Sequence, residues 1–128
     1  MPGMTLDDLK QAVETKYAPW DMDMGEAGYM RLFPILRLEA HERAELMQMQ
    51  SSFNELEAKQ DDEDADPTAL EAQMLDSLRE MFRIVGKRSQ YVEKFLAAVG
   101  DDLASLLVAF QTYSKDTQAG EAPASPTS

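Results

Sequence analysis

An acidic run ahead of Pro67 is the only stretch whose residue types and spacing resemble a metal-binding site. Asp62, Asp64 and Asp66 alternate as the first ligands of a calcium loop do. Such a loop needs glycine at its sixth position and glutamate at its twelfth, where this chain has Pro67 and Gln73. The pattern therefore fails at both diagnostic positions. We interpret the run as a solvated linker, because like charges so dense repel one another.

His41 is the single histidine, and the chain has no cysteine. No serine or second histidine stands at a spacing that would make His41 a general base or a metal ligand. The sequence also lacks a glycine-rich phosphate loop, a nucleophile elbow and a zinc-ligand spacing. We therefore predict that the protein is not an enzyme and that it needs no cofactor or metal.

The charge balance narrows the classes of partner. The 128 residues include 12 basic and 24 acidic side chains, which gives a net charge of -12. Binding to nucleic acid or anionic lipid needs clustered lysine and arginine, so we predict neither partner. The N-terminal residues lack the basic and apolar regions of a signal peptide, and no segment approaches the roughly 20 apolar residues that span a bilayer. We expect a soluble protein inside a cell, with other proteins as partners.

Sequence patterns predict helix, hairpin and helix in the N-terminal half. Thr5 is suited to cap a helix that ends before Pro19, which forbids its continuation. Residues 20–24 and 29–33 then alternate between apolar and polar types around a glycine-containing turn, which is typical of a short β-hairpin. Apolar residues at helical spacing predict a long helix over residues 39–59.

The C-terminal half has the patterns of three short helices. Thr68 is placed to cap the first, Gly86 and Gly100 to separate the three, and Asp101 or Asp102 to cap the last. The predicted fold class is thus mainly α: a small helical domain with one short β-hairpin near the N-terminus and a disordered C-terminal tail. The predicted regions are an N-terminal region at 1–60, an acidic linker at 61–67, a C-terminal helical unit at 68–115 and a disordered tail at 116–128.

Two apolar stripes supply the candidate binding residues. Methionine is abundant on them, and its flexible side chain suits the adaptable recognition of apolar helices. The alternative, which we favour for any single methionine, is that these side chains fill the protein's own core. We predict a partner-binding groove between the long helix over residues 39–59 and the first helix of the C-terminal half. The residues that form it are Leu46, Met47, Met49, Phe53, Met74, Leu78, Met81 and Phe82. Apolar helical faces on so small a chain also suggest self-association.

Three stretches of the chain, in order and at matching spacing, carry a family resemblance. They are residues 5–9 (TLDDL) with Lys16 and Tyr17, residues 31–38 (RLFPILRL), and residues 100–103 (GDDL) with residues 117–122 (TQAGEA). Together they resemble the tail assembly chaperones of long-tailed, siphovirus-type phages of actinobacteria. The resemblance spans nearly the whole chain, and none of its motifs is catalytic.

The resemblance implies a function during tail assembly. A chaperone of this family would bind the tape measure protein, a long helical and apolar chain, and keep it soluble and extended while the major tail protein polymerises around it. It would act in the host bacterial cytoplasm and be absent from the mature virion. The resemblance further implies that this chain is the short product of a frameshifted gene, and that a longer product contacts the major tail protein.

Two other classes remain open at this point. A small acidic adaptor or antitoxin-like protein-binding module would prefer a basic globular partner, and its binding would weaken steeply with salt. A structural subunit of the tail would need long self-pairing strands or a stable ring, whereas these patterns predict one short hairpin.

Overall fold

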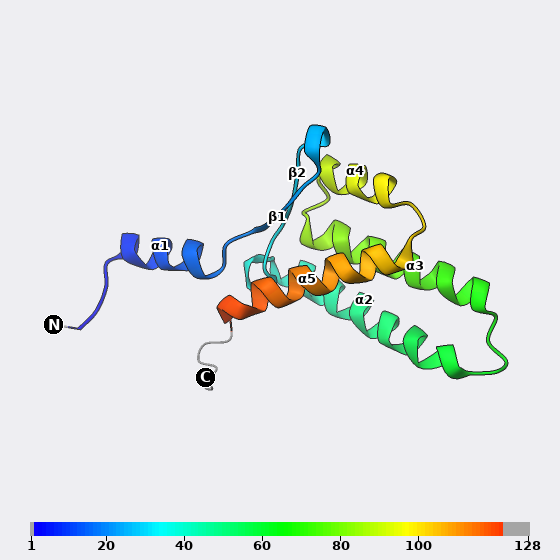
Figure 1. Cartoon of the computed structure of the whole chain (residues 1–128). Helices are drawn as coiled ribbons and strands as arrows, with labels where there is room; N and C mark the ends of the chain where they lie inside the picture. Colours follow the sequence, from blue (N-terminus) through cyan, green and yellow to red (C-terminus); the bar gives the residue numbers. More distant parts are fainter. Residues whose placement is uncertain (1, 122–128) are drawn as a thin grey trace.

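The computed structural model describes the backbone of residues 2–121 and the side chains of residues 2–117. Helices dominate it, and a single antiparallel hairpin lies near the N-terminus (Figure 1), so the predicted fold class is confirmed. The elements are α1 (Leu6–Lys16), β1 (Trp20–Asp23), β2 (Tyr29–Leu32), α2 (Ala40–Ala58), α3 (Pro67–Val85), α4 (Gln90–Val99) and α5 (Leu103–Glu121). Short 3-10 turns occupy Gly25–Ala27, Ile35–Arg37 and Lys59–Asp61.

Helix α1 is fixed locally, and only its last turn comes near another helix, where Thr15 and Lys16 share a hollow with Asp116 and Thr117 of α5. The Thr5 hydroxyl accepts the Asp8 N–H at 3.0 Å, and the Asp8 carboxylate accepts the Thr5 N–H at 3.2 Å, which forms a capping box. Thr5 therefore caps α1, as predicted. None of the residues of α1 is buried, and Figure 1 shows the helix projecting away from the rest of the chain.

The hairpin places one face of each strand toward the helices. Trp20 pairs with Leu32 and Met22 with Met30, in the register expected from the alternating pattern. Met30 and Leu32 are fully buried, because alternate side chains of a strand point to opposite faces. The backbone N–H of Phe33 donates to the Val85 carbonyl at 2.8 Å, which ties the end of β2 to the end of α3.

Helices α2 and α3 form an antiparallel pair whose connection contains the acidic run. Asp66, not Thr68, is the N-cap of α3: its carboxylate accepts the Thr68 N–H at 3.0 Å. The predicted cap is wrong because Pro67 suits the first helical position and starts the helix earlier. The Asp62 carboxylate accepts the Asp64 N–H at 2.9 Å. The acidic side chains thus stabilise turns within a loop, and both halves of the chain share one core.

The last helix is longer than its sequence predicts. Asp102 accepts the N–H of Ser105 at 3.3 Å and caps α5, as one of the two predicted candidates. The predicted tail begins at residue 116, but Asp116 and Thr117 lie within α5. Thr117 is buried, and its hydroxyl donates to the Tyr113 carbonyl at 2.8 Å. Packing of this residue against the rest of the protein therefore extends α5 beyond the predicted end. Residues 122–128 of the predicted tail lie outside the described residues.

A chain of aromatic rings passes through the core and connects four elements. Phe82 of α3 lies 5.1 Å from Phe95 of α4 and 5.4 Å from Phe110 of α5, measured between ring centroids. Phe110 lies 5.2 Å from Tyr113, which in turn lies 6.1 Å from Trp20 of β1. Such tilted and edge-on pairs add to the energy of apolar burial.

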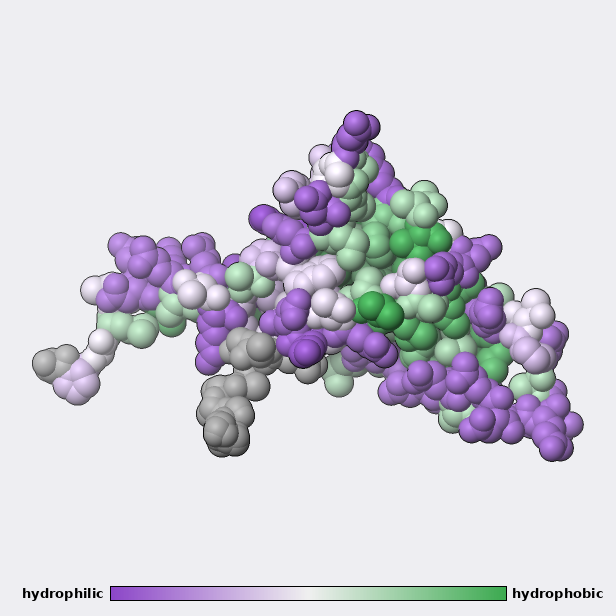
Figure 2. Space-filling model, viewed as in Figure 1, coloured by the Kyte–Doolittle hydropathy of each residue, from purple (hydrophilic) through white to green (hydrophobic). Residues whose placement is uncertain are grey.

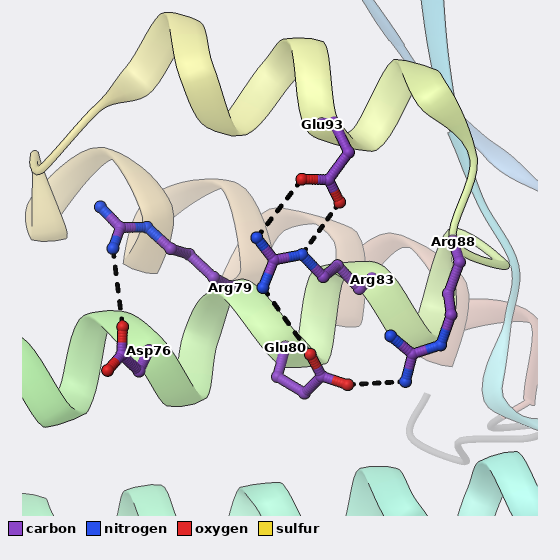
Figure 3. Close-up of polar contacts among 6 residues, drawn as sticks. All are labelled: Asp76, Arg79, Glu80, Arg83, Arg88 and Glu93. Carbon is purple, nitrogen blue, oxygen red and sulfur yellow. Dashed lines mark hydrogen bonds and ion pairs between the residues drawn. The ribbon is translucent and has the colours of Figure 1, made fainter.

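Ion pairs hold α4 against α3 at the surface (Figure 3). Arg83 donates to Glu93 at 2.9 Å and also approaches Glu80, while Arg88 donates to Glu80 at 2.6 Å. The pairing with Arg83 lowers the pKa of the Glu93 carboxyl. Exposed pairs of this kind contribute less than about 1 kcal/mol each, so they orient α4 more than they stabilise it.

Gly86 at the end of α3 is expected to tolerate no side chain. A Cβ there would meet a methyl group of Val92, with the Phe82 carbonyl oxygen 3.0 Å and a Leu32 methyl 3.3 Å away. We expect Gly86→Ala to lower the free energy of unfolding by about 1–3 kcal/mol, measured by urea denaturation. Because Val92→Ala makes room, the double variant should lose less than the sum of the single variants. Additive losses would contradict the steric explanation.

The Glu42–Lys87 pair should make stability depend on acid pH. Lys87 Nζ lies 2.6 Å from the Glu42 carboxylate, and this hydrogen bond is the main cause that lowers the Glu42 pKa. A lowered folded pKa stabilises the protein above the ordinary glutamate value of about 4.3, and the effect is lost as the pH falls through the folded value. Glu42→Gln should cost up to about 1 kcal/mol at neutral pH and flatten the acid loss, whereas exposed Glu55→Gln should change neither.

Candidate partner-binding groove

An apolar groove lies on the surface where β1, α4 and α5 meet. Its volume is about 460 Å³. Val108 of α5 is 60% exposed there, although it is a large apolar side chain. Figure 2 shows apolar side chains gathered over α4 and α5, with hydrophilic residues around them. The main lining residues are Trp20, Met22, Phe95, Val99, Val108 and Thr112.

The floor of the groove is one uncharged face of α5. Ala104, Val108 and Thr112 are four residues apart and Ser105 is three before Val108, so all four lie on the same side of the helix. All four are exposed, and the side chains of Ala104, Ser105 and Thr112 are small. Small side chains let a second helix approach closely. The face is thus suited to contact another apolar helix.

Polar contacts beyond the floor fix the walls of the groove. The Arg79 guanidinium donates to the Gly100 carbonyl at 3.0 Å and to Asp101 at 2.7 Å, which holds the turn between α4 and α5. The Tyr113 hydroxyl donates to the Phe33 carbonyl at 2.6 Å and holds the hairpin against α5. The groove is therefore preformed by rigid elements.

A carboxylate stands at each end of the groove. The Trp20 indole N–H donates to Asp116 at 2.8 Å at one end, and the Ser105 hydroxyl donates to Asp102 at 2.7 Å at the other. The bond from Ser105 is the main cause that lowers the pKa of Asp102, so this end keeps its negative charge. An apolar floor with negative ends favours an apolar helix that carries basic residues beside its apolar stripe.

A second hollow, of about 740 Å³, lies between the hairpin and the turn from α3 to α4. Its lining includes Arg31 and Lys87, which pair with Asp21 at 2.9 Å and with Glu42 at 2.6 Å. These charged groups already have partners. The hollow is larger than the groove but less suited to an apolar partner, because docking there would remove paired charges from water.

Comparison with known proteins gives the family. A family model described as mycobacteriophage tail assembly protein matches residues 3–122. This chain belongs to that family. It is also 26% identical over 129 residues to "Tail assembly protein Gp24" of Mycobacterium phage L5, an alignment that covers 95% of this chain and 96% of that protein. No solved structure matches the chain. The resemblance to a phage tail assembly family is therefore confirmed, and such a family serves assembly rather than catalysis.

Most of the predicted binding residues of this tail assembly protein lie in its own core. Met47 is 66% exposed and Met49 is half-buried. The other six are buried in the core that α2 and α3 share with the other elements: Leu46, Phe53, Met74, Leu78, Met81 and Phe82. Phe53, Leu78 and Met81 line a hollow of about 390 Å³ between α2, α3 and α5, but little of their surface is exposed there. The alternative, that methionines fill the core, fits Met74 and Met81.

The groove residues are those that sequence reasoning missed. Residues 103–110 read LASLLVAF, which is apolar on nearly every side of a helix. Leu106 and Phe110 use one side for the core, so Val108 has to point elsewhere. This excess of apolar residues was the available indication. It could not show that Trp20 and Val99 lie beside Val108.

Neither a candidate metal cluster nor a membrane-spanning helix is found in the part of the tail assembly protein that the structure describes. Within those residues, no three His, Cys, Asp or Glu side chains are grouped to hold a metal ion. None of the described helices combines the length and apolar character needed to cross a membrane. His41 is exposed near the start of α2.

Trp20 is the single tryptophan and therefore reports on the groove. Asp116→Ala removes the acceptor of its indole N–H. We expect a loss of about 1 kcal/mol in the free energy of unfolding and a red shift in fluorescence, since the indole becomes more hydrated. Lys115→Ala, at the neighbouring exposed position, should leave both unchanged. An unshifted spectrum in Asp116→Ala would mean that this hydrogen bond does not hold the wall of the groove.

Proposed function

We propose that this protein is a tail assembly chaperone that binds the tape measure protein and keeps it soluble and extended until the major tail protein polymerises around it. The observation that carries the proposal is an apolar groove of about 460 Å³ on a chain that belongs to a tail assembly family along nearly its whole length. A chaperone of this kind needs an apolar contact surface and no catalytic group.

The proposed contact places an apolar helix of the tape measure protein along α5. Burial of apolar surface contributes roughly 25 cal/mol per Å². Val108 is the most exposed apolar side chain of the groove, so it should lose the most water-exposed area when a helix docks. Trp20 and Val99, both half-buried, would flank the docked helix. The groove thus replaces the predicted site between α2 and α3 as the proposed contact.

The negative charge has a second part in the proposal. A net charge of -12 keeps coated complexes apart, since like-charged surfaces repel one another. The chaperone would thereby keep an apolar chain in solution after binding it. On the family resemblance, we also propose action in the host bacterial cytoplasm, absence from the mature virion, and a longer frameshifted product that contacts the major tail protein.

Co-expression with the tape measure protein of the same phage tests the function and its site together. The tape measure protein should move to the soluble fraction and co-purify with the wild-type chain. Val108→Glu should reduce the co-purified amount at least tenfold, because it places a charge on the apolar floor. Gln111→Glu adds the same charge to an exposed position of α5 outside the groove and should have no effect.

The outcomes separate the alternatives. If Met47→Glu abolishes binding and Val108→Glu does not, the exposed face of α2 is the contact. If binding disappears at high salt, the acidic adaptor is the favoured alternative. Salt screens attraction between charges but has little effect on apolar contacts. If the tape measure protein stays insoluble with the wild-type chain and with the longer frameshifted product, the chaperone proposal is wrong. Mass spectrometry of purified virions should detect no peptide of this chain.

A further inference from the structure

Helix α1 has an apolar stripe with no cover. Leu6 is 65% exposed and Leu9 is 46% exposed, and Val13 lies on the same side of the helix. Figure 2 shows the projecting helix with hydrophilic residues along one edge and apolar residues along the other. A helix of 11 residues is marginal in water unless its apolar side packs against something. The stripe therefore needs a partner surface.

Two lysines border this stripe. Lys10 lies beside Leu6 and Val13, since it is four residues after one and three before the other. Lys16 lies beside Val13, which is three residues before it. It is also seven residues, or two turns, after Leu9, so it borders the edge of the stripe opposite to Lys10. Both lysines are exposed. Helix α1 thus presents an apolar stripe with basic borders.

The groove between β1, α4 and α5 has the complementary chemistry. Its floor is apolar and uncharged, and Asp102 and Asp116 stand at its ends. An apolar stripe bordered by Lys10 and Lys16 matches such a surface in both hydropathy and sign of charge. The two features occur once each in every copy of the chain. Pairing them would cover both.

The connection makes docking on the same copy unfavourable. Helix α1 ends at Lys16, and Trp20 already lines the groove, so the chain would have to reverse direction within three residues. Proline fixes its own φ near -65° and restrains the residue before it to extended conformations, so Pro19 stiffens Ala18 as well. Tyr17 is then the one residue of the three-residue connection whose backbone the proline does not restrain. Exchange with a second copy needs no such reversal.

We propose that α1 is an exchange arm: its stripe of Leu6, Leu9 and Val13 docks in the groove of a second copy of this chain. Exchange in both directions gives a closed two-fold dimer that contains two identical arm contacts. The inference rests on the groove and on α1, not on the identity of the tail partner. It can therefore fail while the proposed function stands, and the reverse also holds.

Analytical ultracentrifugation of the purified full-length chain tests the arm. The wild type should sediment as a dimer at micromolar concentration, and Leu9→Asp and Val108→Asp should each weaken the dimer at least tenfold. Gln11→Asp, opposite the stripe on α1, and Gln111→Asp, on α5 outside the groove, are matched controls that should leave it intact. Circular dichroism checks that every variant is folded. A wild-type monomer at millimolar concentration, or a dimer insensitive to Leu9→Asp, would overturn the proposal.

Cross-linking distinguishes exchange from docking within one copy. The natural chain has no cysteine, so introduced thiols are unique. Leu9→Cys chains mixed with Val108→Cys chains should form a disulfide-linked heterodimer on mild oxidation, and Gln11→Cys chains mixed with Val108→Cys chains should not. If the double variant Leu9→Cys/Val108→Cys instead closes a disulfide within a monomer, α1 docks on its own copy and the exchange proposal is wrong.

Discussion

The row of aromatic rings from Phe95 to Trp20 is the constraint on which the other contacts depend. Phe82 is fully buried and touches rings from two other helices, so it sets where α4 and α5 lie against α3. Tyr113 continues the row and is also fully buried, with its hydroxyl bonded to the hairpin. Buried rings of this size allow little displacement in a close-packed interior. The positions of these rings therefore determine the shape of the groove.

The same row explains why one face of α5 stays uncovered. Leu106, Phe110 and Tyr113 turn toward the core, and the hairpin and α4 reach the edges of the helix but not its outer face. A chain of 128 residues has few elements left to cover that face. Among the described α-helices, α1 alone has no buried residue, and it points away from the body. The uncovered groove and the unpacked helix α1 thus have the same cause: the chain has too few elements to cover both apolar surfaces.

Local patterns in the sequence were enough to predict the hairpin, the positions of most helices and the glycine breaks, because capping, proline and alternation act over a few residues. Competition between neighbouring caps was harder to predict, as Asp66 and Pro67 started α3 ahead of Thr68. For the proposed binding face, the sequence offered only an excess of apolar residues over 103–110. Leu78 and Val108 are both apolar residues on helical stripes, and only the three-dimensional packing makes one core and the other surface.

The contrast between the acidic surface and the apolar groove bears on how selective an assembly protein of this kind can be. Repulsion between chains of charge -12 disfavours indiscriminate contact, so a partner must bring enough apolar area, or basic residues in the right places, to overcome it. Helix α1 brings both on a small scale, with Val13 and Lys16 as neighbours. An apolar helix of a longer partner would bring more area than this short arm. On both proposals, apolar area would decide which helix occupies the groove, and charge would decide which helices approach it.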